Sequence, residues 1–233
     1  LLGGAGPDTL FGGADHDLIG GGAGDDSIQG NLGFDTVWGG AGDDQIAGGY
    51  GLDQLHGGAG ADKIWGEDQA DRIWGDAGND TLLGGVGPDT LFGGADHDLI
   101  GGGAGDDSIQ GNLGHDTVWG GMGRDRITGG AGNDQLHGGA GNDLIWGGMG
   151  NDTLWGDFGM DMFYFHSNQG ADRIADFTPG IDYLVLDIGI DDISDLYHAD
   201  WQQGLRLEWE GGSLLLEAVQ WSDIHPDTDI DLM

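Results

Sequence analysis

The sequence predicts an all-β fold, in which a parallel solenoid of two facing sheets with eighteen residues per turn is followed by a C-terminal β capping segment. Residues 3–164 repeat with a period of nine, each repeat carries one regularly placed apolar residue, and apolar and polar residues alternate after Tyr164. A fixed short period is typical of repeat architectures and outranks local propensity. We therefore expect a repeat region at 1–164 and a capping segment at 165–233.

The repeat has the frame G-G-x-G-x-D-x-U-x, where U is apolar. Steps of nine from Asp8 reach an aspartate eighteen times without a miss, and the first position is glycine in all eighteen copies. The frame aspartates are Asp8, Asp17, Asp26, Asp35, Asp44, Asp53, Asp62, Asp71, Asp80, Asp89, Asp98, Asp107, Asp116, Asp125, Asp134, Asp143, Asp152 and Asp161.

A longer duplication overlies the nonapeptide. Residues 1–40 match 82–121 at all but two positions, an offset of nine repeats. Because nine is odd, each copied residue is expected on the opposite sheet. The first two leucines correspond to the end of a repeat whose start is absent, so we expect the chain to be part of a longer array.

Each repeat divides into a turn and a short strand. Glycine adopts positive φ at little cost, so the six Gly-rich residues suit a turn. The D-x-U-x segment, which starts at the last of these six residues, favours a strand, with U pointing inward. One inward side chain per repeat makes no layer alone, so two strands must face each other. One coil then takes two repeats, and nine coils stack along residues 1–164.

The composition is strongly acidic, with 42 Asp and Glu against 6 Lys and Arg and a net charge of −36. Such charge opposes a compact state and argues against nucleic acid or an anionic membrane as a partner. There is no cysteine to form a disulfide, and no apolar run approaches the roughly 18 residues of a membrane span. A cationic partner is implied.

Stacked coils bring the Asp of one repeat close to the Asp two repeats later. At about 4.8 Å, two bare carboxylates repel by about 3.5 kcal/mol at an effective dielectric near 20. A hard divalent cation reverses the sign, and Ca²⁺ accepts 6–8 oxygen ligands from carboxylates and backbone carbonyls. Eighteen repeats give sixteen such pairs, so up to about sixteen Ca²⁺ ions would bring the charge from −36 to −4. Binding and folding would be one event.

The frame GGxGxDxUx resembles the nonapeptide of the repeats-in-toxin (RTX) family, over residues 3–164. The resemblance implies a parallel β-roll that holds Ca²⁺ between turns through the Asp side chains and loop carbonyls. It also implies an extracellular protein of a Gram-negative bacterium, exported by a type I secretion apparatus with an uncleaved C-terminal signal. The last residues, "DIHPDTDIDLM", are our candidate for that signal.

Several repeats depart from the frame. Asp15, Asp96 and Gln69 replace the third glycine, while Asn31, Asn112, Glu67, Asp76 and Asp157 replace the second. A carbonyl ligand survives only if the backbone keeps its conformation, which Asn and Asp tolerate better than most residues. We expect the sites that involve Gln69 to be affected first.

The C-terminal segment contains "MFYFHSNQGADRIADFTPGIDYLVLD", "GLRLEWE" and "SLLLEAV", whose alternation predicts antiparallel strands. It is similar to the segment that follows many RTX arrays. Its expected role is to cap the open end of the solenoid.

Aromatic residues crowd the last position of the repeat, and Trp38, His56, Trp74 and Phe92 are expected in one row. They could bind a polysaccharide or a cell surface, or simply stack along the sheet, and stacking is the favoured interpretation.

No catalytic constellation is present: there is no H-E-x-x-H, no G-x-S-x-G and no cysteine nucleophile. The leading hypothesis is a calcium-dependent folding and secretion module of a larger protein. The alternatives are an adhesive or carbohydrate-binding module, and the non-catalytic module of a secreted protease, lipase or alginate epimerase.

Overall fold

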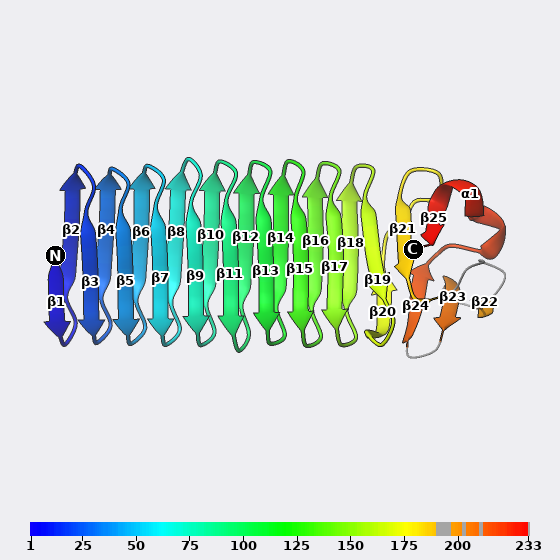
Figure 1. Cartoon of the computed structure of the whole chain (residues 1–233), viewed down its shortest axis with the longest axis horizontal. Coiled ribbons are helices and arrows are strands. Elements are labelled where there is room, and N and C mark those ends of the chain that lie inside the picture. The colour runs from blue at the N-terminus through cyan, green and yellow to red at the C-terminus, as the bar shows by residue number, and fades with distance from the viewer. Residues whose placement is uncertain (190–196, 202–203, 210–211, 233) are drawn as a thin grey trace.

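The computed structural model describes residues 1–189, 197–201, 204–209 and 212–232. The chain forms an elongated solenoid in which successive strands alternate between two facing sheets (Figure 1). The first sheet has twelve strands in the order β1-β3-β5-β7-β9-β11-β13-β15-β17-β19-β21-β25. The second has thirteen, in the order β2-β4-β6-β8-β10-β12-β14-β16-β18-β20-β24-β23-β22.

The strands of the first sheet are β1 (Leu2–Ala5), β3 (Leu18–Ala23), β5 (Thr36–Ala41), β7 (Gln54–Ala59), β9 (Arg72–Ala77), β11 (Thr90–Ala95), β13 (Ser108–Leu113), β15 (Arg126–Ala131), β17 (Leu144–Met149), β19 (Met162–His166), β21 (Tyr183–Asp187) and β25 (Ile230–Leu232). Those of the second are β2 (Thr9–Ala14), β4 (Ser27–Leu32), β6 (Gln45–Tyr50), β8 (Lys63–Asp68), β10 (Thr81–Val86), β12 (Leu99–Ala104), β14 (Thr117–Met122), β16 (Gln135–Ala140), β18 (Thr153–Phe158), β20 (Gly170–Ile174), β24 (Gly212–Glu217), β23 (Gly204–Trp209) and β22 (Tyr197–Trp201).

The pairing confirms a parallel two-sheet solenoid with 18 residues per turn. Ile19 pairs with Val37 and Val37 with Leu55, so each strand lies beside the strand two repeats away. The apolar U residues from Ile19 to Phe163 are at most 1% exposed and form one continuous core between the sheets. A core one side chain deep on each sheet follows directly from one U per repeat.

The strands are longer than the sequence suggests. Each six-residue strand covers x-U-x-G-G-x of the frame, so only the three residues G-x-D form the turn. Our expectation that all six Gly-rich residues form the turn is therefore wrong. The second glycine stays paired in the ladder, as Gly22 with Gly40, although Gly40 has a φ of +118°. Glycine permits this conformation at the end of a paired strand.

The C-terminal segment continues the solenoid before it changes direction. β19, β20 and β21 pair in parallel with β17, β18 and β19, so the predicted antiparallel arrangement is wrong for these strands. It is correct for β22, β23 and β24, which form an antiparallel end of the second sheet. Alternating apolar residues fit either direction, and the last coil offers a parallel edge on which β19 and β20 pair.

Both sheets contain strands from before and after residue 164, so the division into 1–164 and 165–233 stays a prediction. A 3₁₀ helix (Trp221–Asp223) and the short helix α1 (Pro226–Asp229) precede β25. No helix among the described residues is long and apolar enough to cross a bilayer.

The first glycine of each repeat should tolerate no side chain. A Cβ on Gly102 would overlap Asp107 Oδ2 and lie 2.6 Å from the Gly120 carbonyl oxygen, whereas a Cβ on the preceding Gly101 would meet only the end of the Leu83 side chain. We expect Gly102→Ala to lower the free energy of unfolding by about 1–3 kcal/mol through overpacking. Gly101→Ala is the matched control, and urea unfolding with calcium present measures both. Equal stabilities of the two variants would contradict this account.

Candidate metal sites at the two sheet edges

The frame aspartates line both edges of the solenoid. Each one is the last residue of a turn and immediately precedes a strand, as Asp107 precedes β13 and Asp116 precedes β14. Because successive strands alternate between sheets, successive aspartates alternate between edges. The structure therefore brings together, on each edge, aspartates that lie two repeats apart, as the sequence predicts.

One carboxylate oxygen of each pair fixes the register of the next coil. Asp107 Oδ1 accepts the backbone N–H of Asp89 at 2.8 Å, and the N–H of Asp107 donates to Asp125 Oδ1 at 2.9 Å. The same bond recurs at a spacing of 18 residues from Asp8 to Asp161. Hydrogen bonds to an ionised acceptor contribute about 1.5–3 kcal/mol each, so this ladder is a substantial part of the coil-to-coil contact.

The other carboxylate oxygen is buried and has no hydrogen-bond partner among the described residues. This holds for Oδ2 of every frame aspartate from Asp8 to Asp152. The residues from Asp26 to Asp161 are only 1–3% exposed. A buried acceptor without a partner costs about 1–3 kcal/mol, and more if it is charged. A row of such oxygens along both edges must be compensated either by bound cations or by protonation.

A backbone carbonyl oxygen converges on the same place. Gly111 shows this arrangement. A Cβ added to it would overlap Asp116 Oδ2 and would lie 2.6 Å from the Gly129 carbonyl oxygen. This pairing of a carboxylate with the carbonyl of the next coil recurs at sixteen repeats, whose first glycines run from Gly3 to Gly138. The first glycine is thus required because a methyl group would fill the space between the two oxygens.

Burial changes the acidity of these carboxyl groups. Loss of hydration raises the pKa of Asp62 to about 6, of Asp134 to about 7 and of Asp71 to about 8, from 3.8. Neighbouring aspartates add to the rise, while the backbone N–H bonds lower the pKa and only partly offset it. Without a bound cation, this fold therefore favours the protonated form.

The donor set fits a hard cation such as Ca²⁺. It consists only of oxygens, carboxylate and carbonyl, and these are buried and unpartnered. No group of three or more His, Asp or Glu side chains is arranged around a common point in the part of the chain that the structure describes. Each candidate site consequently depends on backbone oxygens as much as on side chains.

Two aspartates outside the nonapeptide region extend the edges. Asp172 Oδ1 accepts the N–H of Asp152 at 3.0 Å, and Asp182 Oδ1 accepts that of Asp161 at 3.1 Å. Burial raises the pKa of Asp172 to about 7. Counting in steps of nine misses both because spacings of 20 and 21 residues replace 18. The signal that could have found them is G-x-D-x-U, which recurs at Gly170 and Gly180.

The residues that replace a frame glycine in the irregular repeats keep a positive φ. The residues that replace the second or third glycine all have φ between +64° and +86°, and they are Asp15, Asn31, Glu67, Gln69, Asp76, Asp96, Asn112 and Asp157. Gln69, where we expected the first defect, has a φ of +79° and donates its N–H to the Val86 carbonyl at 2.6 Å. The turn geometry therefore tolerates these substitutions, at a cost in strain.

The aromatic rows stack along the solenoid, as the favoured interpretation predicts. In the first sheet, the His56 ring lies 6.0 Å from the Trp38 ring and 4.3 Å from the Trp74 ring, with planes within 12°. Trp119, His137 and Trp155 repeat this arrangement in the second sheet, so the two copies occupy opposite faces as expected. Rings inside a stack cover each other's faces and present mainly their edges to solvent.

Comparison with known proteins gives one family and 35 matching chains of solved structures, two of which follow. The solution structure of the AlgE6R3 subunit from the Azotobacter vinelandii mannuronan C5-epimerase is 27% identical over 57% of this chain and 78% of that chain, with a TM-score of 0.41. The extracellular lipase LipA from Serratia marcescens is 19% identical over 97% of this chain and 40% of that chain, with a TM-score of 0.39. At these TM-scores, neither likeness bears on activity or partners. A search of curated proteins finds no match.

The family model for the RTX calcium-binding nonapeptide repeat matches six overlapping segments that together cover residues 1–163. These residues are the ones that carry the buried aspartates, the obligatory first glycines and the two parallel sheets. The chain belongs to the RTX calcium-binding nonapeptide repeat family.

Proposed function

We propose that this chain is a calcium-dependent folding module, in which Ca²⁺ binds between successive coils on both edges of the solenoid. The frame aspartates from Asp8 to Asp161 are the proposed carboxylate ligands, together with carbonyl oxygens of the Gly-rich segments. When bound, Ca²⁺ supplies the positive charge that these oxygens lack. One observation carries the proposal, the unbroken series of buried and unpartnered Asp Oδ2 atoms.

The proposed number of ions is up to about sixteen, one for each pair of aspartates two repeats apart. The sixteen convergent carboxylate and carbonyl pairs support this number. Asp172 and Asp182 continue the hydrogen-bonded ladder, and we add them as candidate ligands at the C-terminal end.

We further propose that the module supports folding outside the cell after type I secretion, as part of a larger protein. The dependence on calcium supports this role, because a chain with a charge of −36 stays open where the ion is scarce and closes where it is plentiful. Any catalytic activity would belong to another part of that protein, since the proposed role of this chain requires no catalytic group.

Removal of calcium should unfold the solenoid. We expect excess chelator to abolish the strand signal in circular dichroism and millimolar Ca²⁺ to restore it cooperatively, because each ion supports the two coils that it joins. Magnesium at the same concentration is the control and should restore less, since Mg²⁺ demands a tighter octahedral site. A strand signal that persists in excess chelator at pH 8, where the carboxyl groups are least protonated, would refute the proposed function.

The variant Asp107→Asn should weaken two calcium sites. It preserves the oxygen that accepts the Asp89 N–H but removes the charge, and Asp107 is bonded to Asp89 on one side and to Asp125 on the other. Native mass spectrometry should show two fewer ions than in the unmodified chain. Asp106→Asn, one residue earlier and exposed, is the control and should lose none. Loss of no more than one ion from Asp107→Asn would show that a carboxylate does not bridge two sites.

Acidification should favour folding of the metal-free chain. Burial raises the pKa of Asp71 to about 8 and of Asp134 to about 7, above the value of 3.8 expected when the chain is unfolded. The folded state then binds more protons between these values, so the free energy of unfolding rises as the pH falls from 8 to 5. In chelator, the strand signal should be greater at pH 5 than at pH 8.

Calcium-loaded protein is the control and should respond in the opposite direction. Because Ca²⁺ requires ionised carboxylates, the calcium concentration at half-folding should rise as the pH falls. A metal-free strand signal that is the same at pH 5 and pH 8, or smaller at pH 5, would contradict the assigned burial of these carboxyl groups.

A further inference from the structure

We propose that the outer face of the first sheet, over strands β13, β15, β17 and β19, carries a binding groove for a pyranose-containing oligosaccharide. The groove lies where the row of aromatic side chains is interrupted by Gln110 and Thr128, between Phe92 and Trp146. It uses none of the proposed calcium ligands, and it depends on the proposed function only because the solenoid must be folded.

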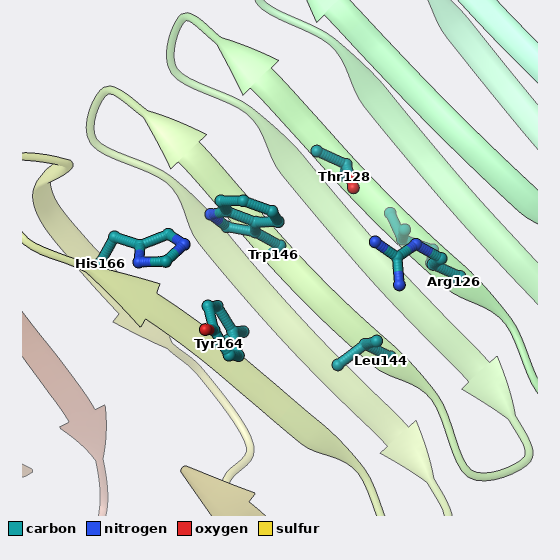
Figure 2. A pocket seen from close by; sticks show the side chains of 7 residues that line it. Arg126, Thr128, Leu144, Trp146, Tyr164 and His166 are labelled. Atoms are coloured by element: carbon teal, nitrogen blue, oxygen red, sulfur yellow. The ribbon is translucent and has the colours of Figure 1, made fainter. Parts of the chain in front are cut away.

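The interruption exposes one face of an indole ring. The ninth residues of successive repeats in this sheet lie side by side, and Thr128 of β15 pairs in register with Trp146 of β17. A ring at this position would cover Trp146, as Trp74 is covered by Phe92 at 5.7 Å. Thr128 is too short to do so, and Figure 2 shows the open space between it and the Trp146 ring.

Trp146 is held from its other side. The Tyr164 ring lies 5.6 Å from it and the His166 ring 4.9 Å, inclined at 57° and 59° (Figure 2). His166 Nδ1 is in turn 2.9 Å from Asp187 Oδ2. The ring is therefore fixed in place before any ligand arrives, which lowers the entropic cost of binding.

The space beside Trp146 is a hollow of about 240 Å³. Arg126 and Leu144 form its remaining side (Figure 2). A second hollow of about 410 Å³ shares Thr128 and is lined by Gln110, Asn112, Leu113, Gly130, Ala131 and Met149. Because Thr128 lines both hollows, we infer that they join into one groove across adjacent strands, with room for more than one sugar ring.

The chemistry of the lining matches a sugar. A pyranose ring offers an apolar C–H face for the indole and a rim of oxygens for hydrogen-bond donors. The described residues supply no ion-pair partner for the Arg126 guanidinium, although the chain has 42 acidic residues. An acyl chain has no oxygen along its length to accept a hydrogen bond from this exposed guanidinium, and the net charge of −36 disfavours nucleic acid.

The internal duplication provides a comparison. Ala47 of β6 corresponds to Thr128 across the nine-repeat offset and pairs with Trp65, so the second sheet has a similar gap. There, Gln45 and Leu83 stand in place of Arg126 and Tyr164. The first copy thus has the gap without the guanidinium or the bracing ring, and with Lys63 in place of Leu144.

Titration of the calcium-loaded chain with cellohexaose, mannohexaose and hexagalacturonate tests the proposal. Indole ¹H–¹⁵N resonances report on binding, with the Trp146 signal assigned through Trp146→Phe and free calcium held constant. We expect a saturable shift of the Trp146 resonance with at least one of these hexamers. Tighter binding of hexagalacturonate would indicate that Arg126 contacts a carboxylate, and tighter binding of a neutral hexamer that it contacts hydroxyl groups.

Thr128→Phe should fill the gap and weaken binding roughly tenfold or more, because it replaces the sugar on the indole face. Other repeats carry aromatic residues at this position, so the variant should fold. Ala47→Phe, its counterpart in the other copy, is the matched control and should bind normally. The absence of a Trp146 shift with all three hexamers, or equal affinities of the two variants, would overturn the proposal. Circular dichroism of each sample separates this outcome from a failure of calcium-dependent folding.

Discussion

The burial of an aspartate carboxylate at every ninth residue constrains the whole solenoid. One oxygen of each carboxylate accepts a backbone N–H from the coil before, and the other has no partner among the described residues. The first glycine of the repeat has no side chain because this second oxygen occupies the space. The U residues can be few because much of the coil-to-coil contact is made at the edges. Eighteen of the 42 acidic residues of the chain stand at these positions.

The two carboxylate oxygens have different roles. The bonded oxygen fixes register, since it joins residues 18 apart and a slip by one repeat would move an aspartate to the opposite edge. The unpartnered oxygen makes the registered state conditional, because like charges stacked about 4.8 Å apart repel unless they are neutralised. Register is therefore set by the bonded carboxylate oxygen, and stability depends on the positive charge that neutralises the other oxygen. This separation lets every coil be locally equivalent, as expected for a quasi-one-dimensional array.

The period alone predicts the eighteen frame aspartates, the two-sheet coil and the aromatic rows, because each depends only on spacing. Strand length was not predicted, since glycine suggests a turn by propensity but here stays paired within the ladder. The direction of β19, β20 and β21 depends on the edge presented by the preceding coil, which alternation cannot reveal. Asp172 and Asp182 lie at altered spacings, so counting in steps of nine misses them and only the G-x-D-x-U pattern marks them in the sequence. The gap at Thr128 could not be predicted, because it depends on which side chains of the neighbouring strands lie beside this residue.

The duplication by nine repeats separates the edges from the faces. Nine repeats make four and a half coils, so each copied residue lies on the opposite sheet and edge from its original. Both edges need an aspartate and both sheets need an inward U residue at the same position of the frame. The copied aspartates and U residues therefore still occupy suitable positions. The outward side chains of the copy, by contrast, move to the opposite sheet, as Trp38 of β5 and Trp119 of β14 show. Nothing in the frame specifies these outward positions. The outward residues can therefore diverge without disturbing the edges or the core. Ala47 and Thr128 occupy corresponding positions but differ from each other and have different neighbours. Divergence of this kind can produce a binding surface.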